Sequence, residues 1–175
     1  MATAIEFRNK KVRQLSLNIA VDIKFDEVLN TINDVHFQGL SAKDEHIHFA
    51  ILEMVNNSLR AQRETARTEP IRLEYECLDA GLRFLVADAG GGFDPWQLPY
   101  DLTQPVDALD TNGPAFQSYR ELHEFQRFGL GLYTVKKVFP NLTITFLDEQ
   151  KNPRPWAEGQ IYGTRIEGWL ENNHV

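Results

Sequence analysis

Hydrophobic residues at every second position predict five strands in this chain. Side chains of a strand point alternately to its two faces, so such alternation produces one apolar face. The pattern is clearest in LSLNIAV, where Leu15, Leu17 and Ile19 share a face. IRLEYECLD and LRFLVAD are separated only by Ala80-Gly81 and favour an antiparallel pair. The predicted strands are residues 15–21, 71–79, 82–88, 142–149 and 163–170.

Apolar residues three or four positions apart predict three helices, at residues 25–37, 41–67 and 129–139. Gly39 stands where a C-cap glycine would follow the first helix. Ser41 is expected as the N-cap of the second, with Asp44 three residues on as its capping partner. Pro70 ends the second helix and Pro140 closes the third.

Strands and helices are both plentiful, which predicts an α+β protein. We expect a two-layer α/β sandwich, with a mixed, mostly antiparallel sheet and helices on one face. The length of 175 residues indicates a single domain, residues 1–175. Residues 93–128 contain four prolines and are predicted to be irregular, with only a weak helical pattern in SYRELHEF. Irregular segments of this length are usually lids or disordered.

Composition narrows the classes of partner. Hydrophobic residues make up 42% and charged residues 25% of the chain, as in ordinary globular proteins. A net charge of -7 argues against nucleic acid as the main partner, because phosphate contacts need a basic face. No apolar run approaches the ~20 residues of a membrane span, and no signal-peptide pattern is present. With Cys77 as its single cysteine, the chain has no internal disulfide, and we expect a reducing, cytoplasmic location.

The first candidate for chemistry is VADAGGGFDP, in which an apolar strand ends in Asp88 and three glycines follow. Gly90 and Gly92 would allow a tight turn, or the close approach of a flat ligand that a Cβ atom would block. An aspartate at the end of a buried strand needs hydrogen-bond donors, and the exocyclic amine of adenine is a suitable one. A glycine-rich turn with a solvated aspartate is the alternative.

A second glycine pair, Gly129 and Gly131, lies in FGLGLYTVKKVF at the start of the third predicted helix. Free amide groups and a partial positive charge at a helix N-terminus suit phosphate. A flexible turn before an ordinary amphipathic helix is the alternative. The chain contains no P-loop sequence, and Thr134 stands where a Rossmann fingerprint needs its last glycine.

The long predicted helix carries Glu53 and Asn57 one turn apart on its polar side. Asn57 belongs to Asn56-Asn57-Ser58, a poor helix-forming run for mid-helix. Phe49 falls on the same side, which indicates that this face is covered. A carboxylate and an amide oxygen directed into one small volume suit a general base and a Mg²⁺ ligand. A solvated polar face is the alternative.

Three motifs therefore occur in order: E-x-x-x-N on a helix, D-x-G-x-G after a strand, and G-x-G at a helix start. Together they resemble the GHKL ATPase superfamily, which includes gyrase, the heat-shock chaperone, histidine kinases and mismatch-repair ATPases, and whose domain has the Bergerat fold. Residues 53–61 resemble its N box, residues 88–92 its first glycine box and residues 129–132 its second. Gly163-Thr164 resembles the late glycine-threonine of the adenine pocket. The resemblance extends over about residues 15–170.

The resemblance implies that the chain binds ATP and Mg²⁺, with residues 93–128 as an ATP lid. Glu53 would be the catalytic general base and Asn57 the Mg²⁺ ligand. The implied nucleotide-binding residues are Asn57, Asp88, Gly90, Gly92, Gly129, Leu130, Gly131, Leu132 and Thr164. Arg120 and Arg127 are lid residues that either reach the γ-phosphate or remain solvated.

Within the superfamily, a short chain with this N box and DAGGGFDP is similar to bacterial anti-sigma-factor serine kinases. These bind a sigma factor and transfer the γ-phosphoryl group of ATP to a serine of a small antagonist protein. The implied partners are ATP/ADP, a sigma factor and the antagonist, with homodimer formation as a further expectation. The Asn57-Ser58 pair departs from the pattern common in these kinases. The alternatives are a nucleotide-gated protein-binding module, a sensor-kinase-like ATPase domain without its own phosphotransfer activity, and a domain that has lost nucleotide binding.

Overall fold

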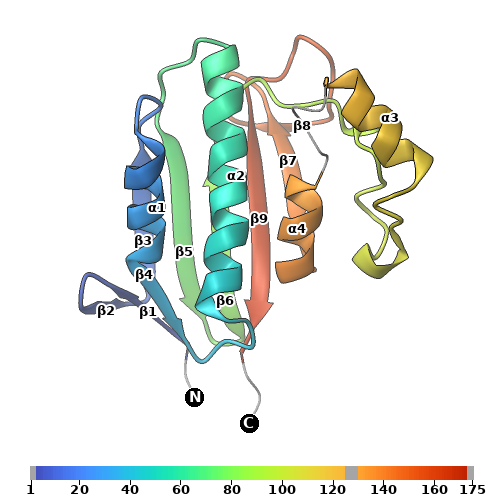
Figure 1. Ribbon diagram of the computed structural model, residues 1–175. Helices are drawn as coiled ribbons and strands as arrows, with labels where there is room; N and C mark the ends of the chain where they lie inside the picture. The colour runs from blue at the N-terminus through green and yellow to red at the C-terminus, as the bar shows by residue number, and fades with distance from the viewer. Residues whose placement is uncertain (1–2, 125–129, 173–175) are drawn as a thin grey trace.

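The computed structural model describes residues 3–124 and 130–172. It has a six-stranded sheet in the order β3-β5-β6-β9-β7-β8 and a three-stranded sheet in the order β2-β1-β4 (Figure 1). The strands are β1 (Ala4–Phe7), β2 (Lys10–Val12), β3 (Gln14–Ile19), β4 (Val35–Gln38), β5 (Ile71–Leu78), β6 (Gly81–Ala87), β7 (Thr143–Leu147), β8 (Pro153–Arg154) and β9 (Gly163–Glu171). The helices are α1 (Phe25–Asn33), α2 (Asp44–Glu64), α3 (Pro114–Leu122) and α4 (Gly131–Val138), with short 3-10 turns at Pro95–Gln97 and Val106–Ala108.

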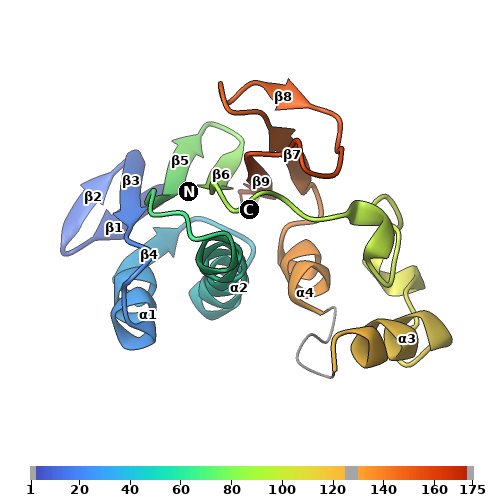
Figure 2. The same ribbon diagram turned by 90° about the horizontal axis from the view of Figure 1, so that it is seen from above.

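The helices α1, α2 and α4 lie on one side of the larger sheet (Figure 2). The strand pairs among the described residues are antiparallel. The sequence-based prediction of an α+β fold with helices on one face of a mostly antiparallel sheet is therefore confirmed. Among the described residues, no helix is both long and apolar enough to cross a membrane.

The core lies between α2 and the central strands. In β5 the apolar residues Leu73 and Tyr75 are fully buried, whereas the alternating residues Arg72 and Glu74 point to the other face. From α2, residues at helical spacing pack against this apolar face; Ile47, Ile51, Met54 and Val55 are fully buried. Burying each such side chain stabilises the fold by about 1.5–3 kcal/mol. The strand alternation of β5 and the helical spacing of α2, both visible in the sequence, therefore determine which faces pack together.

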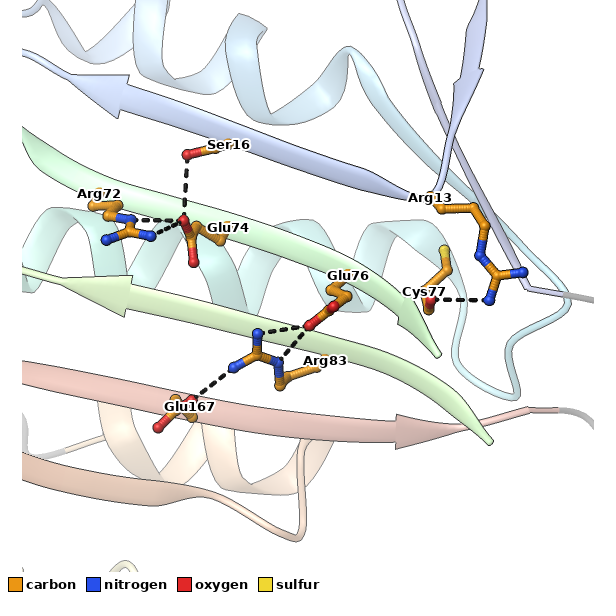
Figure 3. Close-up of polar contacts among 8 residues, drawn as sticks. All are labelled: Arg13, Ser16, Arg72, Glu74, Glu76, Cys77, Arg83 and Glu167. Carbon is orange, nitrogen blue, oxygen red and sulfur yellow. Dashed lines mark hydrogen bonds and ion pairs between the residues drawn. The ribbon is translucent and has the colours of Figure 1, made fainter. Parts of the chain in front are cut away.

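The opposite face of the sheet is polar. Arg83 on β6 donates hydrogen bonds to Glu76 on β5 at 2.6 and 3.0 Å and to Glu167 on β9 at 3.0 Å (Figure 3). On β5, Arg72 also pairs with Glu74. Because these side chains are partly exposed, each pair contributes little to stability. They keep this face of the sheet hydrophilic.

The first predicted helix is too long. It ends at Asn33, and Val35–Gln38 forms β4, which pairs with β1 at the N-terminus. Over four residues, apolar Val35 and Phe37 fit the spacing of a helix and of a strand equally well. The pairing with β1 decides that this segment is a strand. Gly39 has a positive φ of 79°, as expected of a cap, but it follows a strand. The N-terminal hairpin of β1 and β2 was not predicted.

The second predicted helix also differs at both ends. Its N-cap is Lys43, not Ser41, and no side chain caps it. The carboxylate of Asp44 instead accepts hydrogen bonds from the amide of Phe37 at 3.2 and 3.3 Å. At the other end the helix stops at Glu64, before residue 67, because Ala66 has a positive φ of 53° and the amide of Arg67 bonds back to the carbonyl of Gln62 at 2.8 Å. The side chain of Asp44 therefore links the start of α2 to β4 by hydrogen bonds and does not cap the helix.

Candidate functional site

Asp88 is held in place by hydrogen bonds at the end of β6. Its backbone pairs with Thr164 on β9, with N–O distances of 2.9 and 3.3 Å. One carboxylate oxygen, Oδ1, accepts the amides of Gly90 at 2.9 Å and Thr164 at 3.3 Å, and Oδ2 accepts the hydroxyl of Ser58 at 2.7 Å. Three donors from three elements thus orient one carboxylate.

Burial raises the pKa of Asp88 above its ordinary value, and the three hydrogen bonds only partly oppose this. A desolvated carboxylate gains more from each donor than one in water does. Asp88 is therefore suited to accept a further hydrogen bond from a ligand.

The glycines after Asp88 are required by the surrounding protein. A Cβ atom on Gly90 would lie 2.5 Å from the Cβ of Ala61 on α2. At Gly92, where φ is +73°, it would lie 2.7 Å from Cγ2 of Ile161 and 3.2 Å from Phe146. Close packing against α2 and the segment before β9 thus accounts for both glycines without a ligand. It also fixes the loop beside Asp88.

The N-terminus of α4 meets the polar face of α2. A Cβ atom on Gly131 would lie 3.1 Å from both Glu53 Oε2 and Asn57 Nδ2. No side chain caps α4, and its N-cap residue is Leu130. The motifs that the sequence places 74 positions apart, from Asn57 to Gly131, are therefore adjacent. The missing side chain lets the start of α4 lie close to a carboxylate and an amide of α2.

The Asn57 side chain has a competing partner for the predicted metal role. Its oxygen Oδ1 accepts a hydrogen bond from Arg60 Nη2 at 2.7 Å. Within the described part of the chain, no group of three or more His, Cys, Asp and Glu side chains is arranged to hold a metal. This donor set is too small to bind Mg²⁺ by itself, but it suits an ion that arrives with a nucleotide and keeps its waters.

Two residues that support Asp88 were missed by the sequence analysis. Ser58 and Gln62 lie on the buried side of α2, one turn apart, at 3% and 0% exposure. Ser58 donates to Asp88, and Gln62 Oε1 accepts the amide of Ala89 at 3.2 Å. The sequence did carry a signal for them, since both polar residues fall among the apolar positions of the helix. A polar side chain at a buried position needs a hydrogen-bond partner.

Other predicted residues have different environments. Phe49 is 52% exposed, so the expectation that other parts of this chain cover this face of α2 is wrong. Leu132 packs its side chain against the hydrophobic core. Arg120 donates to the carbonyl of Thr111 at 3.0 Å, within the predicted lid. Arg127 and Gly129 lie outside the described residues.

The predicted lid is less irregular than its sequence indicated. Its helical part, α3, runs from Pro114 to Leu122 and so begins before the SYRELHEF segment. Proline occupies its first turn, where a missing amide hydrogen costs nothing.

This combination of a helix with a Glu-Asn pair, a buried aspartate and a glycine-led helix is the arrangement expected of the GHKL class of ATPases. Residues 25–152 match the family described as Histidine kinase-like ATPase domain. The chain belongs to this family. Membership implies ATP binding and ATP-dependent activity. The matched region includes Glu53, Asp88 and Gly131 and ends before Thr164. No curated protein matches the chain.

Replacing Gly131 by alanine tests whether the α4 N-terminus holds phosphates. The new methyl group would lie 3.1 Å from Glu53 Oε2 and Asn57 Nδ2, at the place where the family resemblance implies that phosphate oxygens bind. We expect ATP affinity to fall about tenfold or more, which is ~1.4 kcal/mol. Thermal stability should be retained, because both neighbouring atoms belong to side chains and alanine favours a helix.

Calorimetric titration with ATP, paired with a thermal melt, measures both quantities. Lys137→Ala, an exposed change on the same helix, is the matched control. Wild-type affinity in Gly131→Ala would contradict this phosphate assignment.

Proposed function

We propose that this protein is an ATP-dependent serine/threonine protein kinase of the anti-sigma-factor type. The single observation that supports this most is that the side chains of Glu53 and Asn57 lie next to the start of α4. This arrangement combines a carboxylate for proton removal with helix amides for phosphate in one small volume.

In this proposal Asp88 accepts a hydrogen bond from the adenine amine through Oδ2, while Gly90, Thr164 and Ser58 keep its carboxylate oriented. The backbone of Leu130, Gly131 and Leu132, together with Gly129, binds the phosphates. The N-terminus of α4 carries the partial positive charge of the helix dipole, which stabilises the negative charge of the phosphates.

Mg²⁺ fits the site as an ion carried by the nucleotide, and when bound it neutralises charge on the phosphates. Asn57 would contribute its oxygen, which requires Arg60 to release it. Arg60 is exposed, so its side chain has room to move. Arg60 would then be available to pair with a phosphate oxygen.

The reaction proposed at this site is phosphoryl transfer to a hydroxyl group. The hydroxyl oxygen of a serine on the partner forms a bond to the γ-phosphorus, and the bond from that phosphorus to the bridging oxygen breaks to release ADP. Glu53 takes the hydroxyl proton. Positioning and charge stabilisation supply most of the rate enhancement in such transfers.

The test uses ATP labelled in its γ-phosphate and the proteins that co-purify with the chain from its own cells. We expect acid-stable label on a partner, as phosphoserine or phosphothreonine, only when the chain and Mg²⁺ are both present. Acid-labile label on histidine would instead support a sensor-kinase-like domain. Partner binding that depends on ATP, without label on any protein, would support a nucleotide-gated binding module. Either result would overturn the kinase proposal.

Phe49 marks the side from which the protein partner would approach. It lies one turn before Glu53 on the same face of α2, and its side chain is 52% exposed. A serine that reaches Glu53 from solvent would bring its surrounding protein surface over this ring. We propose that Phe49 docks the phosphoacceptor protein beside its serine.

Phe49→Ala is expected to raise the KM for the acceptor protein about tenfold, because one exposed aromatic anchor is worth 1–2 kcal/mol at an interface. ATP affinity should not change. Phe25→Ala, which removes another exposed phenylalanine, 58% accessible and at the start of α1, is the control. Equal KM values in steady-state assays of the two variants would refute this docking role.

A further inference from the structure

The lid contains a buried lysine contact that the family match does not explain. Lys136 on α4 is only 9% exposed, although it is a lysine. Its ammonium group donates hydrogen bonds to the backbone carbonyls of Leu102 and Gln104. A buried ammonium group is costly unless such acceptors surround it. The contact therefore holds a lid segment 32 to 34 positions earlier in the chain against α4.

An aromatic cluster supports the same attachment. The Tyr100 ring stacks on Phe116 of α3, with centroids 5.6 Å apart and planes at 16°. A second ring next to Tyr100 is that of Tyr133 on α4, edge-on at 6.4 Å. Tyr100 and Phe116 are 8% and 2% exposed, so they form a small core of their own. Tyr133 lies three residues before Lys136, on the same side of α4.

The helix α4 is thus attached on two sides. Val135 and Phe139 are fully buried in the main core, whereas Tyr133 and Lys136 contact the lid. Figures 1 and 2 both show α3 beyond α4, on the side away from α2. The first residue of α4, Gly131, lies next to the side chains of Glu53 and Asn57. One short helix therefore connects the lid with the proposed phosphate site.

We infer that Lys136 is a positioning residue that anchors the lid to the phosphate-binding helix, and so sets how long a nucleotide stays bound. This inference rests on the proposed nucleotide site. Without the anchor, the segment around Leu102 would no longer be tied to α4. In the wild type we expect the Lys136 contacts to hold the lid over the bound nucleotide and to slow its release. Without these contacts, release should be faster.

The experiment compares Lys136→Met with Lys137→Met. Both remove one positive charge from adjacent positions of α4, but Lys137 is exposed and contacts only the Tyr133 ring among the interactions described. Release of a fluorescent ATP analogue is followed by stopped flow. We expect Lys136→Met to release it about tenfold faster, with little change in association rate, and Lys137→Met to match the wild type.

A second readout does not depend on nucleotide. Hydrogen exchange of the free protein should be faster over residues 98–110 in Lys136→Met, and unchanged over β5 and β6. Lys136→Arg should restore slow exchange and slow release, because a guanidinium can also donate to two carbonyls. Phe116→Leu, which removes the aromatic stack, should change both readouts in the same direction if Lys136→Met folds poorly.

Wild-type release and wild-type exchange in Lys136→Met would overturn the anchor. Equal acceleration by Lys136→Met and Lys137→Met would overturn it as well, since charge alone would then be responsible. Failure of the wild type to bind the analogue would instead refute the proposed nucleotide site, and normal exchange over residues 98–110 would separately refute the attachment.

Discussion

Replacing Glu53 by glutamine is expected to lower phosphoryl transfer by a factor of about 10²–10⁴. The amide has the same shape, so its position next to the start of α4 should persist. It has no basic oxygen to accept the proton of the attacking hydroxyl, and this is the step that fails. The expected loss is in kcat, measured as label transferred from ATP per unit time.

ATP affinity should not fall in this variant. Glu53 lies beside Gly131, where the phosphates are proposed to bind, so its negative charge opposes theirs. Glutamine removes that repulsion, and we expect calorimetric affinity to stay equal or to rise by up to about tenfold. Glu45→Gln, an exposed change on the same helix, should leave both rate and affinity unchanged. Full transfer activity in Glu53→Gln would show that another group takes the proton.

Replacing Asp88 by asparagine is expected to lower ATP affinity by about 100-fold or more, corresponding to ~3 kcal/mol for a lost hydrogen bond to a charged group. Asparagine fits the protein well. Its oxygen can accept the amides of Gly90 and Thr164, and its nitrogen can donate to the hydroxyl oxygen of Ser58. That nitrogen would face the adenine amine, however, and two donors repel. Calorimetric titration measures the loss, and an unchanged affinity would remove Asp88 from the nucleotide site.

The same variant should gain stability relative to the wild type as pH rises. Burial raises the folded pKa of Asp88 above its ordinary value of 3.8. Its stabilising contribution is therefore fully present below pH 3.8 and is lost as pH rises through the folded value. Asparagine has no charge to desolvate and avoids this loss.

Urea unfolding between acid and neutral pH checks this sign. The free energy of unfolding of Asp88→Asn minus that of the wild type should increase toward neutral pH and then level off. The control, Asp79→Asn, changes an aspartate whose side chain is fully exposed, so its difference should vary little. A difference that decreases toward neutral pH would mean that the folded protein stabilises the charged carboxylate instead of destabilising it by burial.

Local patterns in the sequence predicted much of the fold. The β5–β6 hairpin was expected because two alternating segments are joined by a short glycine turn, and all of that information lies within residues 71–88. The buried side of α2 followed from helical spacing. Strand β4 was mistaken for helix, because its partner β1 lies about 30 residues earlier and leaves no mark on the sequence of β4.

By itself, the sequence determined the class of protein, because the Glu-Asn pair and the two glycine loops are short motifs whose residue types specify their chemistry. Only the tertiary structure decided how they are supported. Ser58 reaches Asp88 across 30 positions, and Lys136 reaches Leu102 across 34. A contact at such separation depends on how α2, α4 and the lid pack in space. No residue pattern within either segment encodes it, so packing rather than local propensity determines the orientation of Asp88 and the attachment of the lid.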